Sequence, residues 1–295
     1  MREWYANDFY EVRRDAESQQ PHEIPLPLPL SADAWTFSYL VQEYERSALA
    51  ALSALDAAVA TADVGHLQTL QLSDRVSSSK IEGIHADVER LRFHRNNPTE
   101  KPPSGLEEVL ALSYAYDLMF RGIKRTSLTQ TRLREAHEKM WMYSSDNHAR
   151  PGSYRDRTVY IIDSATGEVE CVPPPAWMVP HLMRDLFDFM EHAEMSSLKK
   201  IAVVHHRFEA IHPFADGNGR IGRMLIDAML TKEGLLSGPF LNLSTQIFRE
   251  RNRYYRLLAD TSRLGDFDEW IVWFLRLVAQ AAENSLTQLS QSRAG

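Results

Sequence analysis

The chain has 295 residues, of which 44% are hydrophobic and 25% are charged, a composition typical of a globular protein with a full-sized core. The formal net charge of −7 argues against a nucleic-acid or anionic-membrane partner. The single cysteine, Cys171, excludes an intrachain disulfide and fits a reducing compartment. At this length we expect one large domain or two small ones.

The N-terminal residues predict an extended arm and no targeting segment. Charges interrupt residues 1–5, where a signal peptide needs an apolar core, and prolines alternate with apolar residues over 24–29. Alternating prolines exclude a helix, so we expect the arm to lie on its own domain; a ligand for an SH3-type domain is the alternative. The best candidate membrane span, 271–277, is too short and contains Arg276. We therefore expect a cytoplasmic protein without a membrane partner.

Helical patterns follow the arm. Residues 31–33 offer a helix start, and residues 48–62 are rich in strong helix formers. A further helix is predicted over 73–81, ending near Gly83, because glycine adopts the left-handed conformation that ends many helices.

The polar segment 96–104 contains two adjacent prolines and predicts a linker. We therefore divide the chain into an N-terminal segment, 1–104, and a core, 105–295. Within the core, residues 106–123 and 129–143 again predict helices.

A β-hairpin interrupts the helical pattern over residues 158–172. Its first strand, 158–163, is β-branched and aromatic, a turn follows, and 169–172 forms the second strand. Three prolines end the hairpin, and helix resumes by Met178. Because a single hairpin cannot be the core of a sheet, we expect it to act as a flap.

The most informative stretch is 212–223, HPFADGNGRIGR, which lies between two helical patterns. Its glycine-rich part therefore opens a helix, where unpaired N–H groups and the helix dipole favour an anion. His212 can act as a base near neutral pH, and Asp216 is a hard ligand for Mg²⁺ when phosphates complete the shell. Gly217 and Gly219 lack Cβ atoms, so a phosphate can approach the backbone closely.

Two arginines complete the loop. Arg220 and Arg223 stand three residues apart, share a helix face and can bind separate phosphate oxygens. These residue types together indicate a site for a nucleotide phosphate chain. A plain turn between two helices is one alternative. Another is a metal-dependent hydrolase that uses His205 and His206 with the loop, although adjacent helical residues point to different faces and can hardly share one metal.

The stretch resembles, position by position, the signature of the Fic family, His-Pro-Phe-x-Asp/Glu-Gly-Asn-Gly-Arg-x-x-Arg. Residues 207–211 resemble the family's lead-in, the hairpin with its prolines resembles a target-docking flap, and residues 254–258 with 270–271 resemble the closing helices. The resemblance implies a mainly α protein, with a Fic-type helical bundle core, one β-hairpin flap and an N-terminal helical segment.

The resemblance also implies an activity, the transfer of AMP from ATP to a Ser, Thr or Tyr hydroxyl of a protein. His212 would take the proton of that hydroxyl, Asp216 would hold Mg²⁺ between the α- and β-phosphates, and Arg220 and Arg223 would meet the β- and γ-phosphates. The nucleotide-binding residues implied in this way are Gly217, Asn218, Gly219, Arg220, Ile221, Gly222, Arg223, Asn252, Tyr255 and Leu258.

The adenine site is expected on the closing helices. Tyr254 and Tyr255 are adjacent, so a helix points them about 100° apart, and one can face the base while the other packs. The resemblance favours Tyr255, with Leu258 and Asn252 nearby. The spacing around 262–265 departs from the family and leaves the base preference open.

Residues 78–83, SSKIEG, match a second family pattern, Ser/Thr-x-x-x-Glu-Gly/Asn. The resemblance implies an inhibitory helix whose motif residues are Ser78, Glu82 and Gly83. Glu82 would pair with Arg223 and deny it to the γ-phosphate, since one guanidinium cannot serve a carboxylate and a phosphate fully at once. ATP could still bind, but with its α-phosphate turned wrongly for attack.

The flap residues Val159, Tyr160 and Ile161 are expected to dock the target by offering a strand edge. Removal of AMP or transfer of another phosphate-containing group by the same site is the alternative activity. A third alternative is a non-enzymatic binding module. The presence of His212 and Asp216 argues against it. Self-modification and a homodimer stay open, and no C-terminal DNA-binding module is expected.

Overall fold

The computed structural model describes the chain except for residues 1–34, 99, 101, 145–149, 163–168 and 292–295. The predicted proline arm, the helix start at 31–33 and the turn of the hairpin therefore lie outside the described residues.

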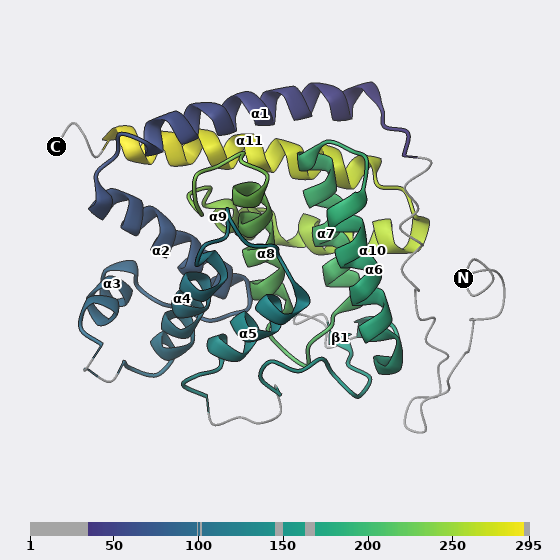
Figure 1. Ribbon diagram of the computed structural model, residues 1–295, viewed down its shortest axis with the longest axis horizontal. Coiled ribbons are helices and arrows are strands. Elements are labelled where there is room, and N and C mark those ends of the chain that lie inside the picture. The colour runs from purple at the N-terminus through teal and green to yellow at the C-terminus, as the bar shows by residue number, and fades with distance from the viewer. Residues whose placement is uncertain (1–34, 99, 101, 145–149, 163–168, 292–295) are drawn as a thin grey trace.

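The described part of the chain is mainly helical, as the sequence predicts. Helices α1 and α11 run side by side along one edge of the molecule, and α8 lies among α2, α4, α5 and α7 (Figure 1). The elements are α1 (Tyr39–Val59), α2 (Val64–Ile81), α3 (Val88–Asn96), α4 (Leu106–Phe120), α5 (Gln130–Met140), β1 (Ile161–Ile162), β2 (Val169–Cys171), a 3₁₀ helix (Ala176–Met178), α6 (Val179–His192), α7 (Ser197–Ile211), α8 (Asn218–Lys232), α9 (Leu243–Arg249), α10 (Arg251–Leu264) and α11 (Asp268–Gln291).

Short polar side chains set the starts of several helices. In four helices the residue just before the helix accepts a hydrogen bond from a backbone N–H of the first turn through its side chain. These residues are Ser38 before α1, Asp63 before α2, Asp87 before α3 and Thr129 before α5. Such caps satisfy N–H groups that have no partner within the helix. The predicted helix over 73–81 is the second half of α2, whose start the sequence interpretation placed too late.

The hairpin is shorter than the predicted one. Ile161 pairs with Cys171 and Ile162 with Val169 in an antiparallel ladder whose register shifts between the two pairs. An extended flap over 158–172 is not seen in the described residues. Strands this short gain little ladder stability, and a lone two-stranded hairpin is marginal in water.

The main hydrophobic core joins the N-terminal helices to the rest of the described chain. It contains Leu52 of α1 and Ile81 of α2 together with Leu112 of α4 and Trp270 of α11. A smaller cluster lies between α2, α3 and α4: Leu72, Leu91, Leu106, Val109 and Leu110. Both cores draw on residues from either side of the linker, and the division of the chain at residue 104 stays a prediction.

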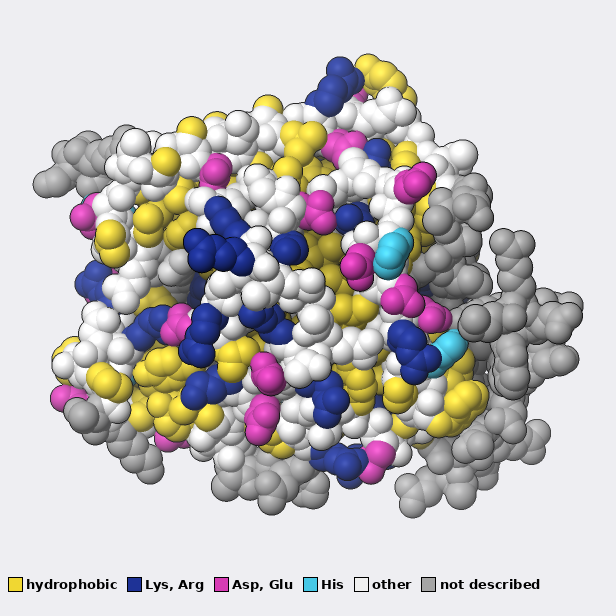
Figure 2. Space-filling model, viewed as in Figure 1, with side chains coloured by type: hydrophobic (Ala, Val, Ile, Leu, Met, Phe, Trp, Pro, Cys, Tyr) yellow, Lys and Arg dark blue, Asp and Glu magenta, His cyan; other side chains and the backbone are white. Residues whose placement is uncertain are grey.

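The molecular surface carries both signs of charge. Acidic and basic side chains are interspersed over the face shown in Figure 2. No helix in the described residues combines the length and the apolarity that a bilayer span requires.

Candidate active site

The loop between α7 and α8 is built around two left-handed residues. His212 directly follows α7 with φ 50° and ψ 61°, and Gly217 directly precedes α8 with φ 81°. A left-handed conformation costs a residue with a side chain about 1–3 kcal/mol, so contacts of the surrounding structure must hold His212 there. Phe214 is fully buried beneath the loop, and the Asn218 side chain bonds both the N–H and the carbonyl of Phe214, at 2.8 and 2.9 Å.

His212 is half-buried and presents one ring nitrogen as a base. Its Nδ1 lies 3.4 Å from the carbonyl oxygen of Glu209, and because a carbonyl only accepts, Nδ1 carries the proton and Nε2 keeps its lone pair. Burial lowers the pKa of His212 to about 4, and the positive charge of Arg155 lowers it further. The hydrogen bond to the carbonyl of Glu209 and the negative charge of Glu82 act in the opposite direction. The ring is therefore neutral at pH 7.

The first turn of α8 is uncapped and lies beside a carboxylate. In the described structure no side chain caps this turn, in contrast to α1, α2, α3 and α5. Gly219 lies in this turn without a Cβ, and the nearest atom to the place that a Cβ would take is Oε1 of Glu82, 2.4 Å away. A carboxylate thus lies where the helix dipole and unpaired N–H groups favour negative charge.

Asp216 fits the Mg²⁺ ligand that the sequence predicts. Its side chain is 64% exposed and accepts a hydrogen bond from the N–H of Gly217. No group of three His, Cys, Asp or Glu ligands forms in the described residues. A single exposed carboxylate suits Mg²⁺, which is usually held by one or two carboxylates together with phosphates and water.

Arg220 is buried beside the loop. Its Nη1 donates to Oε2 of Glu108 at 3.1 Å, and its guanidinium lies 5.4 Å from the ring of Trp141. Its Nε is buried without a hydrogen-bond partner in the described structure. Glu108 and Trp141 belong to helices that the sequence predicts, but no local pattern connects either to the loop.

Arg223 joins the loop to the segment with the inhibitory motif. Its Nη2 donates to Oε1 of Glu82 at 2.6 Å and to the carbonyl of Ser78 at 2.9 Å, while its Nε donates to Oγ of Ser78 at 2.9 Å. The Arg223 side chain is 2% exposed and that of Glu82 is 33% exposed. Gly83 follows Glu82 with φ 81°, which an L-residue rarely adopts. The structure therefore brings together the two segments that the sequence pairs.

Helix α2 is attached to α9, which fixes Glu82 relative to the loop. Oδ1 of Asp74 accepts from the N–H of Ser244 at 2.8 Å, and the hydroxyls of Ser77 and Thr245 lie 2.8 Å apart. These bonds hold the last turns of α2 against the same core that carries α8.

The two adjacent histidines have structural partners. Nε2 of His205 lies 3.1 Å from the hydroxyl of Tyr254, and Nε2 of His206 lies 3.1 Å from the carbonyl of Leu258. Burial lowers the pKa of each to about 3. Since they face different partners, the metal-dependent hydrolase finds no support in the described residues.

The two tyrosines of α10 differ in burial. Tyr254 is buried and packs against Trp270 and Trp273, whereas Tyr255 is half-buried. Burial raises the pKa of Tyr255 to about 12, and the charge of Glu82 adds to it. Tyr255 thus lies on the side of the Glu82–Arg223 ion pair, and its place in an adenine site stays a prediction.

The other expected adenine contacts are spread over α10. Leu258 is half-buried, and Asn252 is exposed at a separate cavity of about 310 Å³ at the junction of α9 and α10. Because that cavity is lined only by residues 248–253, the structure does not join Asn252 to the loop.

His137 supports the loop, although sequence reasoning did not single it out. Its ring stacks on Phe214 with centroids 3.9 Å apart, Nδ1 accepts from the N–H of Gly152, and Nε2 lies 3.0 Å from the carbonyl of Asp216. Burial lowers its pKa to about 4. A histidine inside a predicted helix carries no local signal for this role.

Glu209 is a buried acid of the site. A Cβ on Gly222 would lie 2.2 Å from its Oε1, and burial raises its pKa to about 8. An acid one turn after two adjacent histidines and one turn before His212 is a signal that could have singled it out. The close approach also explains why position 222 needs glycine.

The flap residues are partly accessible. Val159 and Ile161 are half-buried, and Tyr160 is 40% exposed. The segment after β2 is linked to the loop, because Arg155 donates hydrogen bonds to the carbonyls of both Pro174 and His212.

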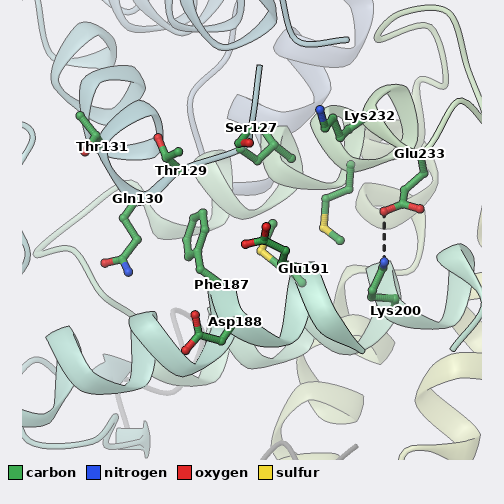
Figure 3. Close-up of a pocket in the computed structure, with 13 residues that line it drawn as sticks. Ser127, Thr129, Gln130, Thr131, Phe187, Asp188, Glu191, Lys200, Lys232 and Glu233 are labelled. Atoms are coloured by element: carbon green, nitrogen blue, oxygen red, sulfur yellow. Dashed lines mark ion pairs between the residues drawn. The ribbon is translucent and has the colours of Figure 1, made fainter. Parts of the chain in front are cut away.

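A further cavity lies at the other end of α8. It has a volume of about 530 Å³ and is lined by residues 127–131 and by parts of α6, α7 and α8. An ion pair of 3.1 Å between Lys200 and Glu233 lies at its edge (Figure 3). None of the predicted nucleotide-binding residues lines it.

The chain resembles proteins with a named activity. It is 27% identical over 179 residues to a probable protein adenylyltransferase of Aquifex aeolicus, which covers 60% of this chain and 52% of the relative. It is 29% identical over 188 residues to the protein adenylyltransferase Fic of Nematostella vectensis, which covers 62% of this chain and 38% of the relative. The chain thus spans about half of these relatives, or less.

The fold has counterparts among solved structures. The crystal structure of a Fic family protein from Desulfovibrio desulfuricans aligns with a TM-score of 0.74 at 24% identity, covering 86% of this chain and 76% of that one. A structure of Fic-1 from C. elegans aligns with a TM-score of 0.63 at 20% identity, covering 86% and 74%. Residues 127–230, which include the whole signature loop, match the model of the Fic/DOC family. This part of the chain is therefore a Fic domain and belongs to the Fic/DOC family.

Proposed function

We propose that this protein is an auto-inhibited protein adenylyltransferase that moves AMP from ATP to a protein hydroxyl. One observation carries the proposal: a neutral His212 lies beside an uncapped, glycine-containing helix N-terminus from which Arg220 and Arg223 project. The activity named for the Aquifex and Nematostella relatives supports the choice of AMP transfer over other phosphate chemistry.

The first step is nucleophilic. Nε2 of His212 takes the proton of a Ser, Thr or Tyr hydroxyl as its oxygen bonds to the α-phosphorus, and the bond from that phosphorus to the bridging oxygen breaks to release pyrophosphate. His212 stays neutral before the reaction because burial disfavours the imidazolium, and the triphosphate's negative charge makes the ring a stronger base once ATP binds.

The remaining residues position charge. N–H groups around Gly219 bind the phosphates, Arg220 stabilises the β-phosphate, and Arg223 stabilises the γ-phosphate when Glu82 releases it. Asp216 would hold Mg²⁺ together with the phosphates, and the ion would supply positive charge near the leaving pyrophosphate. Such fixed donors and cations are the main source of catalysis in phosphoryl-type transfer.

Inhibition follows from competition for one guanidinium. Glu82 binds Nη2 of Arg223 at 2.6 Å and lies against Gly219, so it takes both the cation and the anion position that the γ-phosphate needs. The α2 segment thus reduces transfer without blocking His212. The target hydroxyl is expected to reach His212 along the flap residues Val159 to Ile161, by strand addition.

Parallel incubations with α-labelled and γ-labelled ATP test the function. The Glu82→Gln protein is used, and label that stays on protein, including the chain itself, is counted after denaturing gels. We expect retention of the α label alone, and its loss in Glu82→Gln/His212→Ala. Retention of the γ label would establish phosphoryl transfer instead, and equal α labelling without His212 would rule out the proposed base.

A further inference from the structure

Arg155 is a buried arginine that bonds only to the main chain. It lies between α5 and β1 and is 3% exposed. Its own N–H donates to the carbonyl of Pro213 at 2.9 Å. Its guanidinium donates to four carbonyl oxygens: those of His212 (2.8 Å), Ile211 (3.2 Å), Arg157 (3.2 Å) and Pro174.

Two of these carbonyls belong to the end of α7. The last carbonyls of a helix have no partner within the helix, and a cation there is favoured by the helix dipole. Arg155 satisfies the carbonyls of Ile211 and His212 at the point where the chain turns left-handed. The Asn218 side chain holds the backbone of Phe214, two residues after His212. The backbone is therefore held by Arg155 at residues 211–212 and by Asn218 at residue 214, so the strained His212 lies within a fixed turn.

The fourth carbonyl belongs to the segment that follows β2. A guanidinium is a rigid planar fork, so the carbonyls that it binds keep a fixed relative position. The hairpin end, through Pro174, is therefore fixed to the backbone of His212.

The charge of Arg155 has no counter-ion in the described residues, because every partner of its guanidinium is a neutral carbonyl. Burial lowers the pKa of Arg155 to about 10, so the side chain is still charged at neutral pH. Two charges act on the His212 ring. The positive charge of Arg155 disfavours protonation of the ring, and the negative charge of Glu82, next to the end of α2, favours it.

We propose that Arg155 is a positioning residue of the transfer reaction, which locks the turn that carries His212, fixes this turn to the flap hairpin and places a positive charge beside the imidazole. The inference rests on the proposed function for its catalytic meaning. The structural and electrostatic parts of the inference are independent of the proposed function, because they concern the His212 ring and its turn in the absence of substrate.

Titration of His212 by NMR, with ¹⁵N-labelled histidine and no nucleotide, tests the electrostatic part. His212→Ala assigns the signal. We expect Arg155→Gln to raise the His212 pKa by about one unit, the lower end of the effect of a close charge. Arg155→Lys should leave the pKa in place, and Arg157→Gln removes a charge at an exposed position as the control. An unchanged His212 titration in folded Arg155→Gln would overturn the electrostatic role.

Activity tests the positioning part, in the Glu82→Gln background. Arg155→Lys keeps the charge but cannot reach four carbonyls, so transfer of the α label should fall at least tenfold while the affinity for MgATP changes less than twofold. Full transfer by Arg155→Lys would overturn the positioning role. If Arg155→Gln does not fold, as thermal unfolding would show, Arg155→Lys still decides this part. No α label even with Glu82→Gln alone would count against the proposed function and leave the NMR result valid.

Discussion

The inhibitory pair offers the sharpest perturbation. In Glu82→Gln the side chain keeps its size and its place but loses the charge that holds Nη2 of Arg223. A charge-assisted hydrogen bond contributes about 1.5–3 kcal/mol, and because the Glu82 side chain is 33% exposed we take about 2 kcal/mol. The γ-phosphate no longer has to displace this carboxylate, so transfer at low ATP should rise about 30-fold.

The assay is the initial rate of α-label retention at ATP concentrations below half-saturation. Arg223 keeps its two bonds to Ser78 in the variant, so the site should stay formed. Glu233→Gln is the matched control, because it also removes the acid of a partly exposed ion pair, with Lys200 at 3.1 Å, at the far end of α8. A rate within twofold of wild type for Glu82→Gln, or an equal rise for Glu233→Gln, would refute the competition.

Further predictions concern protonation and packing. Because the His212 pKa is about 4 and not 6.5, its base form persists on acidification, so the α-label transfer rate of Glu82→Gln should stay level from pH 8 to about 6. His205 and His206 have pKa values of about 3 in the folded chain, so the unfolded chain binds more protons below pH 6.5 and the urea-measured free energy of unfolding should fall from pH 7 to pH 5. Gly222→Ala places a Cβ 2.2 Å from Oε1 of Glu209 and should lower the free energy of unfolding by about 1–3 kcal/mol; no loss would mean that Glu209 moves freely.

The helical fold and the loop could be predicted because their signals are local. A few adjacent residues are enough to predict the helix over 73–81, the glycine at 83 that ends it, and the loop between two helices. The start of α2 at Val64 was missed because its N-cap, Asp63, lies in a sequence without a strong apolar period. The hairpin was predicted too long because the β-branched and aromatic residues at 158–160 fit a strand pattern, although no described strand pairs with them.

The supports of the loop could not be predicted, since they are contacts between distant segments. His137 stacks under Phe214, Glu108 binds Arg220, and Arg155 binds carbonyls 56 and 57 residues away. Each is an ordinary residue in its own segment and gains its role only when α4, α5 and α7 pack around α8. The Glu82–Arg223 pair spans 141 residues and was predictable only through the family resemblance.

The placement of Glu82 also predicts how the proposed inhibition would be relieved. Glu82 is the residue directly after α2, and α2 itself is bonded to α9 through Asp74 and Ser77. Freeing Arg223 from the Glu82 carboxylate therefore requires rotation of one partly exposed side chain, while the bonds of Arg223 to Ser78 and the attachment of α2 to α9 stay in place. Since carboxylate and γ-phosphate are drawn to the same helix N-terminus and the same guanidinium, the inhibition should weaken as ATP rises. The ratio of Glu82→Gln to wild-type rates should accordingly shrink toward saturating ATP, and a constant ratio would mean that Glu82 acts on the orientation of bound ATP.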